Sequence, residues 1–269
     1  PWKKRSSMKH TAKPEQDVLR VTLISNAGLL LEYNGITLML DGIYGREGHP
    51  FSNLSADTWQ RMLQGLPPFQ QIDYLLFSHA HPDHFSPEMT CEFLQHRRVK
   101  GVFLPSGMGE AAGALLDVLQ TRRIPCVTLS EQTNHAYYRI EPDITVHAFS
   151  TRHLDRKFWN IPHFCYLITF GKKQVLFTAD VDYTSETFAA LGDTPLRAVF
   201  VNPLFFSALE KGSYFHGTLH TQSICIYHVP FSQDDSMRMR SPLARNLVEW
   251  PLDRQETFIL CDAFQQIEL

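Results

Sequence analysis

The sequence predicts an α/β protein, a four-layer αββα sandwich in which two mixed β-sheets pack face to face with helices on their outer faces. Predicted elements follow in the order strands, helix, strand, helix, and then strands and helices again, which is typical of layered α/β domains. Hydrophobic residues make up 43% of the 269-residue chain and charged residues 20%, as in ordinary globular proteins. No linker, repeat or low-complexity segment is visible. We therefore expect one domain over residues 18–269 after a loose, polar leader at residues 1–17.

The first elements are short strands and two well-capped helices. Three apolar stretches with turn signals between them predict strands over residues 18–25, 29–33 and 36–41. Asn34-Gly35 is a strong hairpin signal between the last two. Beyond a loop at residues 42–53, Ser55 caps a predicted helix over residues 55–63. A buried strand is expected over residues 73–78, and Ser86 with Pro87 begins a helix over residues 86–97.

The rest of the chain repeats this alternation and then becomes rich in strands. Helices are expected over residues 109–122, 185–191 and 242–250. Apolar or alternating runs predict strands over residues 99–104, 126–129, 135–140, 144–150, 164–170, 174–178, 198–201, 223–228 and 257–261.

Composition argues against several classes of protein. The formal net charge of −3 removes the broad attraction to phosphate backbones on which nucleic-acid binders depend. Five cysteines without a CxxC pair favour free thiols in a reducing compartment. No run approaches the roughly 18 apolar residues that would span a bilayer. We expect a cytoplasmic protein with a small-molecule substrate and no membrane or nucleic-acid partner. Whether it forms a homo-oligomer is left open.

One short string carries the chemistry. Directly after the strand at residues 73–77 stands Ser78-His79-Ala80-His81-Pro82-Asp83-His84, in which four residues can bind metal. In an extended segment, His79 and His81 leave the chain on the same side because they are two residues apart. Pro82 then turns the chain, so that Asp83 and His84 point to a neighbouring position. This spacing suits two adjacent metal ions, and packing alone explains three histidines and an aspartate poorly.

These residues match in full the HxHxDH signature of the metallo-β-lactamase superfamily, which the chain resembles from about residue 18 to residue 230. The resemblance implies that superfamily's fold, the αββα sandwich, and further ligands at the ends of later strands. The matching positions are His153, Asp180 as the bridging carboxylate, and His228. By the same resemblance, His79, His81 and His153 would hold one metal, and Asp83, His84 and His228 the other. Asp83 and Asp180 are then expected to be catalytic as well as ligating.

Each of the later assignments has a competitor. His147 lies inside a predicted strand, whereas His153 follows one, so we prefer His153. Asp182 lies two residues beyond Asp180, but only Asp180 directly follows an apolar run. His216 and His220 compete with His228 from a loop rich in Gly, Ser and Thr before the last ligand strand.

The resemblance implies a hydrolase that uses a metal-bridging hydroxide to cleave a small ester, lactone or phosphoester. Within the superfamily, the chain looks like the broad branch that includes ascorbate-6-phosphate lactonase. Two divalent cations are expected, with zinc the first choice and Mn or Fe equally suited to nitrogen and oxygen donors. Asp41 is expected to hold a ligand histidine in its working tautomer. The candidates for a general acid or a substrate contact are His163, Asn202 and His220.

Two other functions remain open from the sequence. The first is a phosphodiesterase or nuclease that acts on nucleotides. The second is a non-catalytic metal-binding protein on the same fold.

Overall fold

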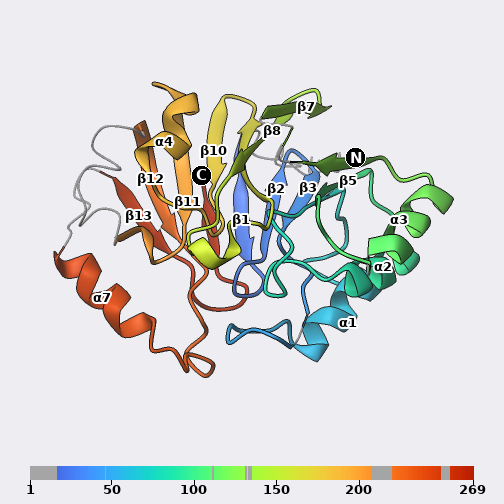
Figure 1. The fold of residues 1–269 in the computed structure, drawn as a ribbon, viewed down its shortest axis with the longest axis horizontal. Coiled ribbons are helices and arrows are strands. Elements are labelled where there is room, and N and C mark those ends of the chain that lie inside the picture. The colour runs from blue at the N-terminus through green and yellow to red at the C-terminus, as the bar shows by residue number, and fades with distance from the viewer. Residues whose placement is uncertain are drawn as a thin grey trace, which may run out of the picture.

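The computed structural model describes residues 17–45, 47–110, 112–130, 132, 135–206, 220–249 and 255–269. Its two seven-stranded sheets face each other with helices outside, so the predicted αββα sandwich is confirmed (Figure 1). The predicted leader lies outside the described residues except for Asp17. Over the described part of the chain, no helix has the length and apolarity needed to cross a membrane.

The first sheet has the strand order β14-β1-β2-β3-β4-β5-β6. Its neighbours from β14 to β3 are antiparallel, and those from β3 to β6 are parallel. The strands are β1 Arg20–Leu23, β2 Leu29–Tyr33, β3 Ile36–Leu40, β4 Tyr74–Leu76, β5 Gly101–Pro105, β6 Cys126–Leu129 and β14 Gln266–Glu268.

The second sheet has the order β13-β12-β11-β10-β9-β8-β7 and is again mixed. Strands β10 to β13 are parallel to one another, whereas β9, β8 and β7 continue the sheet in antiparallel fashion. The strands are β7 His135–Glu141, β8 Ile144–Thr151, β9 His163–Phe170, β10 Lys173–Phe177, β11 Pro195–Val201, β12 His220–Ile226 and β13 Glu256–Ile259.

Helices cover the two outer faces. On the right of Figure 1, the first sheet is covered by α1 Ala56–Gln64, α2 Pro87–His96 and α3 Ala112–Thr121. The two predicted N-caps are present, since Ser55 accepts a hydrogen bond from Thr58 N and Ser86 accepts one from Met89 N. On the left, the second sheet carries α4 Ser185–Phe188, the 3₁₀ turn η2 Ala189–Leu191 and α7 Arg240–Glu249. A further 3₁₀ turn, η1, spans Arg156–Phe158.

The core between the sheets is large and apolar. Fully buried side chains such as Leu31 and Leu40 from the first sheet share one cluster with Phe164, Tyr166 and Phe177 from the second. Each such side chain removed from water stabilises the fold by about 1.5–3 kcal/mol before the entropy cost is counted. The alternation of the strands thus holds the two sheets together, and with them the strand ends that carry the polar motif.

The predicted and observed elements differ at three places named here. Strand β14 was not predicted, because it has only three residues and pairs with β1 from the far end of the chain. The predicted helix at residues 185–191 is divided into α4 and η2. The predicted strand at residues 223–228 begins at His220 and ends at Ile226. His228 therefore lies in the loop that leaves the sheet.

Strands of both sheets end at the same edge of the sandwich. The parallel neighbours β3 and β4 end together, and so do β10, β11 and β12. Strand β8 runs in the direction of β10, because both are antiparallel to β9. Backbone hydrogen bonds join the loops at this edge, from Phe164 N to Ser78 O across the two sheets (3.0 Å) and from Leu154 N to Asp180 O (2.8 Å).

Candidate metal centre

The seven side chains expected to bind metal lie together at this edge. They follow β4, β8, β10 and β12, and each is at most 9% exposed. Their potential ligand atoms form two groups whose members lie within 4.8 Å of one another, with Asp180 in both. One group is His79, His81, His153 and Asp180, and the other is Asp83, His84, Asp180 and His228.

The spacing within both groups suits a bound cation. In the first group, His79 Nε2 lies 2.9 Å from His81 Nδ1. In the second, His84 Nε2 lies 3.0 Å from His228 Nε2, and Asp83 Oδ2 lies 3.4 Å from that same atom. Ligands about 2.0–2.2 Å from a tetrahedral metal ion are about 3.4 Å apart. Imidazole lone pairs this close repel each other unless a proton or a metal ion lies between them.

Hydrogen bonds fix which nitrogen of His79 is free. Ser78 Oγ donates to Asp41 Oδ2 (2.6 Å), so it is left to accept from His79 Nδ1 at 2.9 Å. The proton of a neutral His79 ring then sits on Nδ1, and the lone pair of Nε2 points into the first group. Such outer hydrogen bonds are the usual way in which proteins orient a metal-binding imidazole.

Asp41 does the same for His84. Its carboxylate is fully buried and accepts from Ser78 N (2.8 Å), while its Oδ2 lies 2.9 Å from His84 Nδ1. Because a carboxylate only accepts, the proton lies on Nδ1 and His84 Nε2 faces the second group. The sequence analysis expected Asp41 to hold a ligand histidine, and the structure places its carboxylate against His84.

Sequence reasoning missed Asn26, whose side chain is the hydrogen-bond partner of His228. The Nδ2 atom of Asn26 lies 2.7 Å from His228 Nδ1, and Asn26 is fully buried. In this orientation Nδ2 donates to Nδ1, and the proton of a neutral His228 ring lies on Nε2. Turning the amide by 180° would let Oδ1 accept from Nδ1–H and leave Nε2 free for a metal ion. One signal was present, since Asn26 follows the first strand just as Asp41 follows the third.

His153 is held differently from the other histidines. Its Nδ1 accepts a hydrogen bond from Asp155 N (3.0 Å), and its Nε2 is buried without a hydrogen-bond partner among the described residues. The proton of a neutral ring then lies on Nε2, so metal binding at that atom requires Asp155 N–H to release Nδ1. Trp159 Nε1 donates to His153 O (2.9 Å) and keeps the loop in place.

The charge balance of the second group favours a cation. Burial raises the pKa of Asp180, but the His228 and His84 imidazoles outweigh it and hold that pKa well below its ordinary range. Burial lowers the pKa of His84, but the carboxylates of Asp83, Asp180 and Asp41 raise it well above its usual value. Without a metal, a proton on His84 therefore supplies the positive charge that these carboxylates require. A divalent cation would displace that proton.

Three residues of the site have left-handed backbone conformations. Asp41, Ala179 and His228 have φ values of 48°, 47° and 59°, and each lies just beyond the end of its strand. Such conformations are unfavourable for residues other than glycine and gather at functional sites. Here they turn each chain sharply, which brings Asp41, Asp180 and His228 toward the centre.

The remaining candidates divide into two sets. Asn202 is at the site, where its Nδ2 donates to Ala179 O (3.0 Å) and Asp180 Oδ1 (3.2 Å). His163 is fully buried beside His79, with ring centroids 4.9 Å apart, and its Nδ1 lies 2.6 Å from Thr151 Oγ1. Expecting His220 at the site was wrong: it begins β12, at the opposite end from His228, and pairs with exposed Asp193.

The competitors of the chosen ligands lie elsewhere. His147 is inside β8 and stacks on Tyr137 with centroids 3.9 Å apart, next to His135. The Asp182 carboxylate lies 3.7 Å from Arg152 and belongs to neither group. His216 lies outside the described residues.

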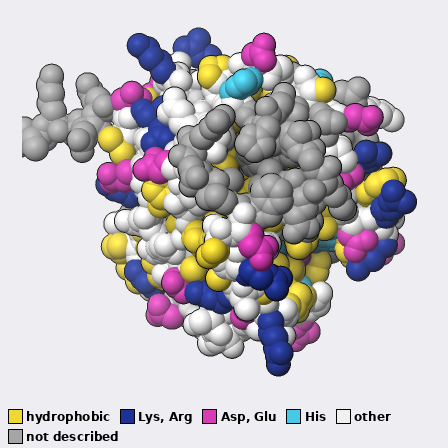
Figure 2. All heavy atoms as spheres, turned by 90° about the vertical axis from the view of Figure 1, so that its left-hand side faces the viewer, with side chains coloured by type: hydrophobic (Ala, Val, Ile, Leu, Met, Phe, Trp, Pro, Cys, Tyr) yellow, Lys and Arg dark blue, Asp and Glu magenta, His cyan; other side chains and the backbone are white. Residues whose placement is uncertain are grey.

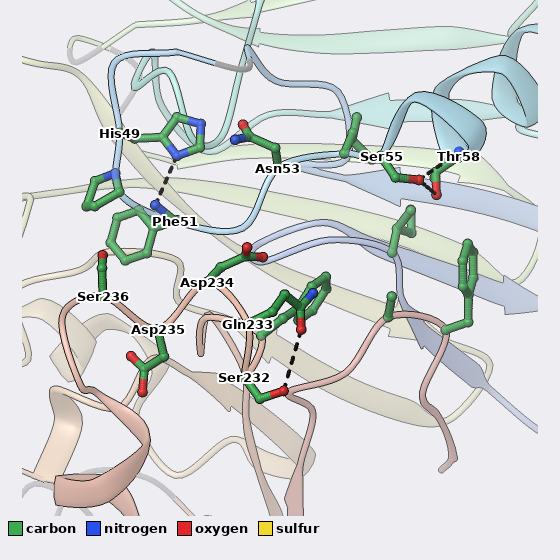
Figure 3. A pocket seen from close by; sticks show the side chains of 16 residues that line it. His49, Phe51, Asn53, Ser55, Thr58, Ser232, Gln233, Asp234, Asp235 and Ser236 are labelled. Atoms are coloured by element: carbon green, nitrogen blue, oxygen red, sulfur yellow. Dashed lines mark hydrogen bonds between the residues drawn. The ribbon is translucent and has the colours of Figure 1, made fainter.

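A cavity of about 450 Å³ opens onto the two groups. A second cavity of about 810 Å³ lies next to it, and His49, Pro50 and Phe51 line both. Figure 3 shows this second cavity, with the loop through His49, Phe51 and Asn53 facing Asp234 and Asp235. The Phe51 ring meets His228 edge-on at a centroid distance of 4.6 Å, so it forms the wall on the side of the metal groups.

Comparison with known proteins gives a family and a fold. A family model described as a beta-lactamase superfamily domain matches residues 53–226. No curated protein sequence matches the chain.

Several solved structures have the same fold at low identity. The isothiocyanate hydrolase from Delia radicum gut bacteria has a TM-score of 0.61 and 13% identity, with 92% of this chain and 98% of that chain covered. The metallo-beta-lactamase fold protein YhfI from Bacillus subtilis has a TM-score of 0.56 and 15% identity, with 94% and 100% covered. For CmlA, a diiron beta-hydroxylase from Streptomyces venezuelae, the TM-score is 0.55 and the identity 17%, with 96% and 54% covered. The present chain thus spans about half the length of that hydroxylase.

Proposed function

The chain belongs to the beta-lactamase superfamily, and we propose that it is a metal-dependent hydrolase that cleaves a small ester, lactone or phosphoester. One observation carries the proposal. Two groups of buried histidine and aspartate ligand atoms share Asp180, an arrangement that suits a pair of adjacent metal ions bridged by one carboxylate.

The donors fit divalent cations. His79, His81 and His153 would hold one ion, and Asp83, His84 and His228 the other, with Asp180 between them. The set contains imidazole nitrogen and carboxylate oxygen without thiolate, which suits zinc, manganese or iron, and zinc is our first choice. When bound, two such cations lower the pKa of a shared water and polarise the oxygen of the bond to be cleaved.

The chain's own residues set up this chemistry. Asp41 and Ser78 keep protons on the outer nitrogens of His84 and His79, so that the inner nitrogens are free. Asn202 holds Asp180 by a hydrogen bond, which fixes the carboxylate common to both groups. The apolar side chains of Phe51 and Phe158 border the cavity and reduce the access of bulk water.

The substrate class can be tested with purified protein and a defined panel. Metal content is measured first, and turnover is then followed with a p-nitrophenyl ester, a lactone, a thioester and bis(p-nitrophenyl) phosphate. We expect about two equivalents of metal, turnover of at least one substrate, and loss of turnover on chelation. Preference for bis(p-nitrophenyl) phosphate would favour a phosphodiesterase. Zero turnover with every metal tried would favour a non-catalytic metal-binding protein and overturn the proposal.

The described side chains on one face of the molecule give little support to a nucleic-acid substrate. On the face shown in Figure 2, Lys and Arg side chains are interspersed with Asp and Glu over the described residues. A nuclease that tracks a phosphate backbone usually has a continuous basic surface. We therefore keep the small-molecule hydrolase as the proposal and the nuclease as an outcome of the panel.

A further inference from the structure

The cavity over the metal groups has mostly apolar walls. They come from four separate loops: Phe51 after β3, Leu154 and Phe158 after β8, Leu204 after β11, and Met239 before α7. Phe158 also packs edge-on against His81, at a centroid distance of 4.4 Å, so an apolar surface reaches the ligands themselves. A substrate that reaches the metal groups must therefore lay its body against hydrocarbon.

The polar side chains in the described lining, apart from the metal-binding ones, are already bonded to the protein. Asn202 donates to Ala179 O and Asp180 Oδ1, and its Oδ1 accepts from Leu204 N (3.0 Å). His49 Nδ1 accepts from Phe51 N (3.2 Å), and its Nε2 lies 2.9 Å from Gly45 O. Replacing such bonds with bonds to a ligand brings little net gain.

The described lining contains one cation and one further carboxylate, and they pair with each other. Lys157 Nζ lies 3.1 Å from Asp155 Oδ2 and 4.6 Å from the centroid of the Phe158 ring. The nearby guanidinium groups of Arg152 and Arg156 lie over the Trp159 ring instead, and neither residue lines the cavity. Beyond the metal groups, the described walls therefore have no unpaired charge to receive an anionic or cationic body.

We propose that this cavity takes an uncharged substrate whose body is apolar, so that esters or lactones of aliphatic or aromatic acids fit it better than sugar phosphates or nucleotides. The proposal rests on the proposed function, because that function places the scissile bond at the metal groups. Its claim about the walls, however, depends only on the residues that line the cavity. Recognition comes from burial of apolar surface, and the metal groups select the polar bond at one end.

Three matched amides test the walls by binding rather than by turnover. Hexanamide, adipamic acid and 6-aminohexanamide share an amide head and a similar chain, and end in a methyl, a carboxylate and an ammonium group. Isothermal titration calorimetry on the metal-loaded protein should give a Kd for hexanamide at least tenfold below the Kd of either charged probe. Equal or tighter binding of a charged probe, or no binding of any of the three, would overturn the proposal.

A charge placed in the wall should change this order. Leu204 is 46% exposed at the cavity, and Leu116 is 43% exposed on α3, so Leu116 offers a matched control. We expect Leu204→Arg to improve the Kd of adipamic acid at least tenfold relative to hexanamide, and Leu116→Arg to leave the ratio unchanged. An unchanged ratio in folded Leu204→Arg protein, or an equal change in the control, would contradict the assigned wall.

Turnover of p-nitrophenyl esters separates the two proposals. From acetate to hexanoate, kcat/KM should rise about three- to fourfold per methylene, because each added group is buried against the wall. Turnover without such a rise would refute the proposal that the substrate has an apolar body, but it would leave the proposed hydrolase function intact. If hexanamide binds more tightly than both charged amides but no substrate is turned over, the hydrolase function is refuted. The assignment of an apolar wall to the cavity would then stand.

Discussion

Replacing Asp41 by asparagine tests how the second metal group is held in place. The carboxylate accepts three hydrogen bonds, from Ser78 N, from Ser78 Oγ and at His84 Nδ1. Asparagine keeps the shape but turns one acceptor oxygen into an NH₂ donor. If that NH₂ group takes the place of Oδ1, it faces the donor Ser78 N–H. If it takes the place of Oδ2, His84 must move its proton to Nε2, which is the atom that faces the metal group.

The size of the effect follows from these contacts. Loss of an outer partner of a metal-binding histidine usually lowers metal affinity about 10- to 100-fold, or about 1.4–2.8 kcal/mol. The buried mismatch should also lower the free energy of unfolding of the metal-free protein by about 1–3 kcal/mol. Both losses are expected in Asp41→Asn.

The assay is a titration of metal-free protein with zinc against a competing chelator, together with urea unfolding. Asp73→Asn is a matched control, because Asp73 is 6% exposed and accepts from Thr37 N (2.9 Å) and Gln71 Nε2 (2.8 Å) at the start of β4. The control should lose stability but keep its zinc affinity. Wild-type zinc affinity in Asp41→Asn would refute the argument that Asp41 orients His84.

Three further predictions concern the site and its surroundings. His81→Ala or Asp180→Ala should abolish turnover and reduce bound metal, measured by elemental analysis, while the circular dichroism spectrum is kept; wild-type rate and metal content in either would contradict their assignment as ligands. Asn26→Ala should lower zinc affinity about tenfold, because His228 loses the partner of its Nδ1, and an unchanged titration would argue against it. Burial, with His135 nearby, lowers the pKa of His147 to about 4. At His147 the unfolded chain thus binds more protons between pH 6.5 and 4, so this residue should lower the free energy of unfolding by up to about 3 kcal/mol as pH falls through that window. In urea unfolding of metal-free protein, His147→Phe should therefore lose less stability over the same window than the wild-type chain.

The sequence predicted the fold and the first ligands because both are local. The string from His79 to His84 is six residues long, and a strand before it indicates which way its side chains face. The alternation of short strands and capped helices predicts the layers in the same way. The pairing of β14 with β1, by contrast, depends on a three-residue strand at the far end of the chain, which is too short to predict on its own.

Other parts of the site depend on contacts that no local pattern encodes. Asn26 reaches His228 across 202 positions of the chain, and only the three-dimensional structure brings them together. The left-handed turn at Ala179 is likewise a consequence of packing, since alanine does not favour this conformation. His220 was a candidate for a general acid or substrate contact, but it begins β12, and the length of that strand separates it from the ligand edge.

The most direct test of the two-metal centre is anomalous diffraction from crystals of the metal-loaded protein at the metal's absorption edge. The account predicts two peaks about 3.5–4 Å apart, one beside His79, His81 and His153 and one beside Asp83, His84 and His228, with Asp180 between them. A single peak at full metal loading, or metal bound away from these side chains, would contradict it.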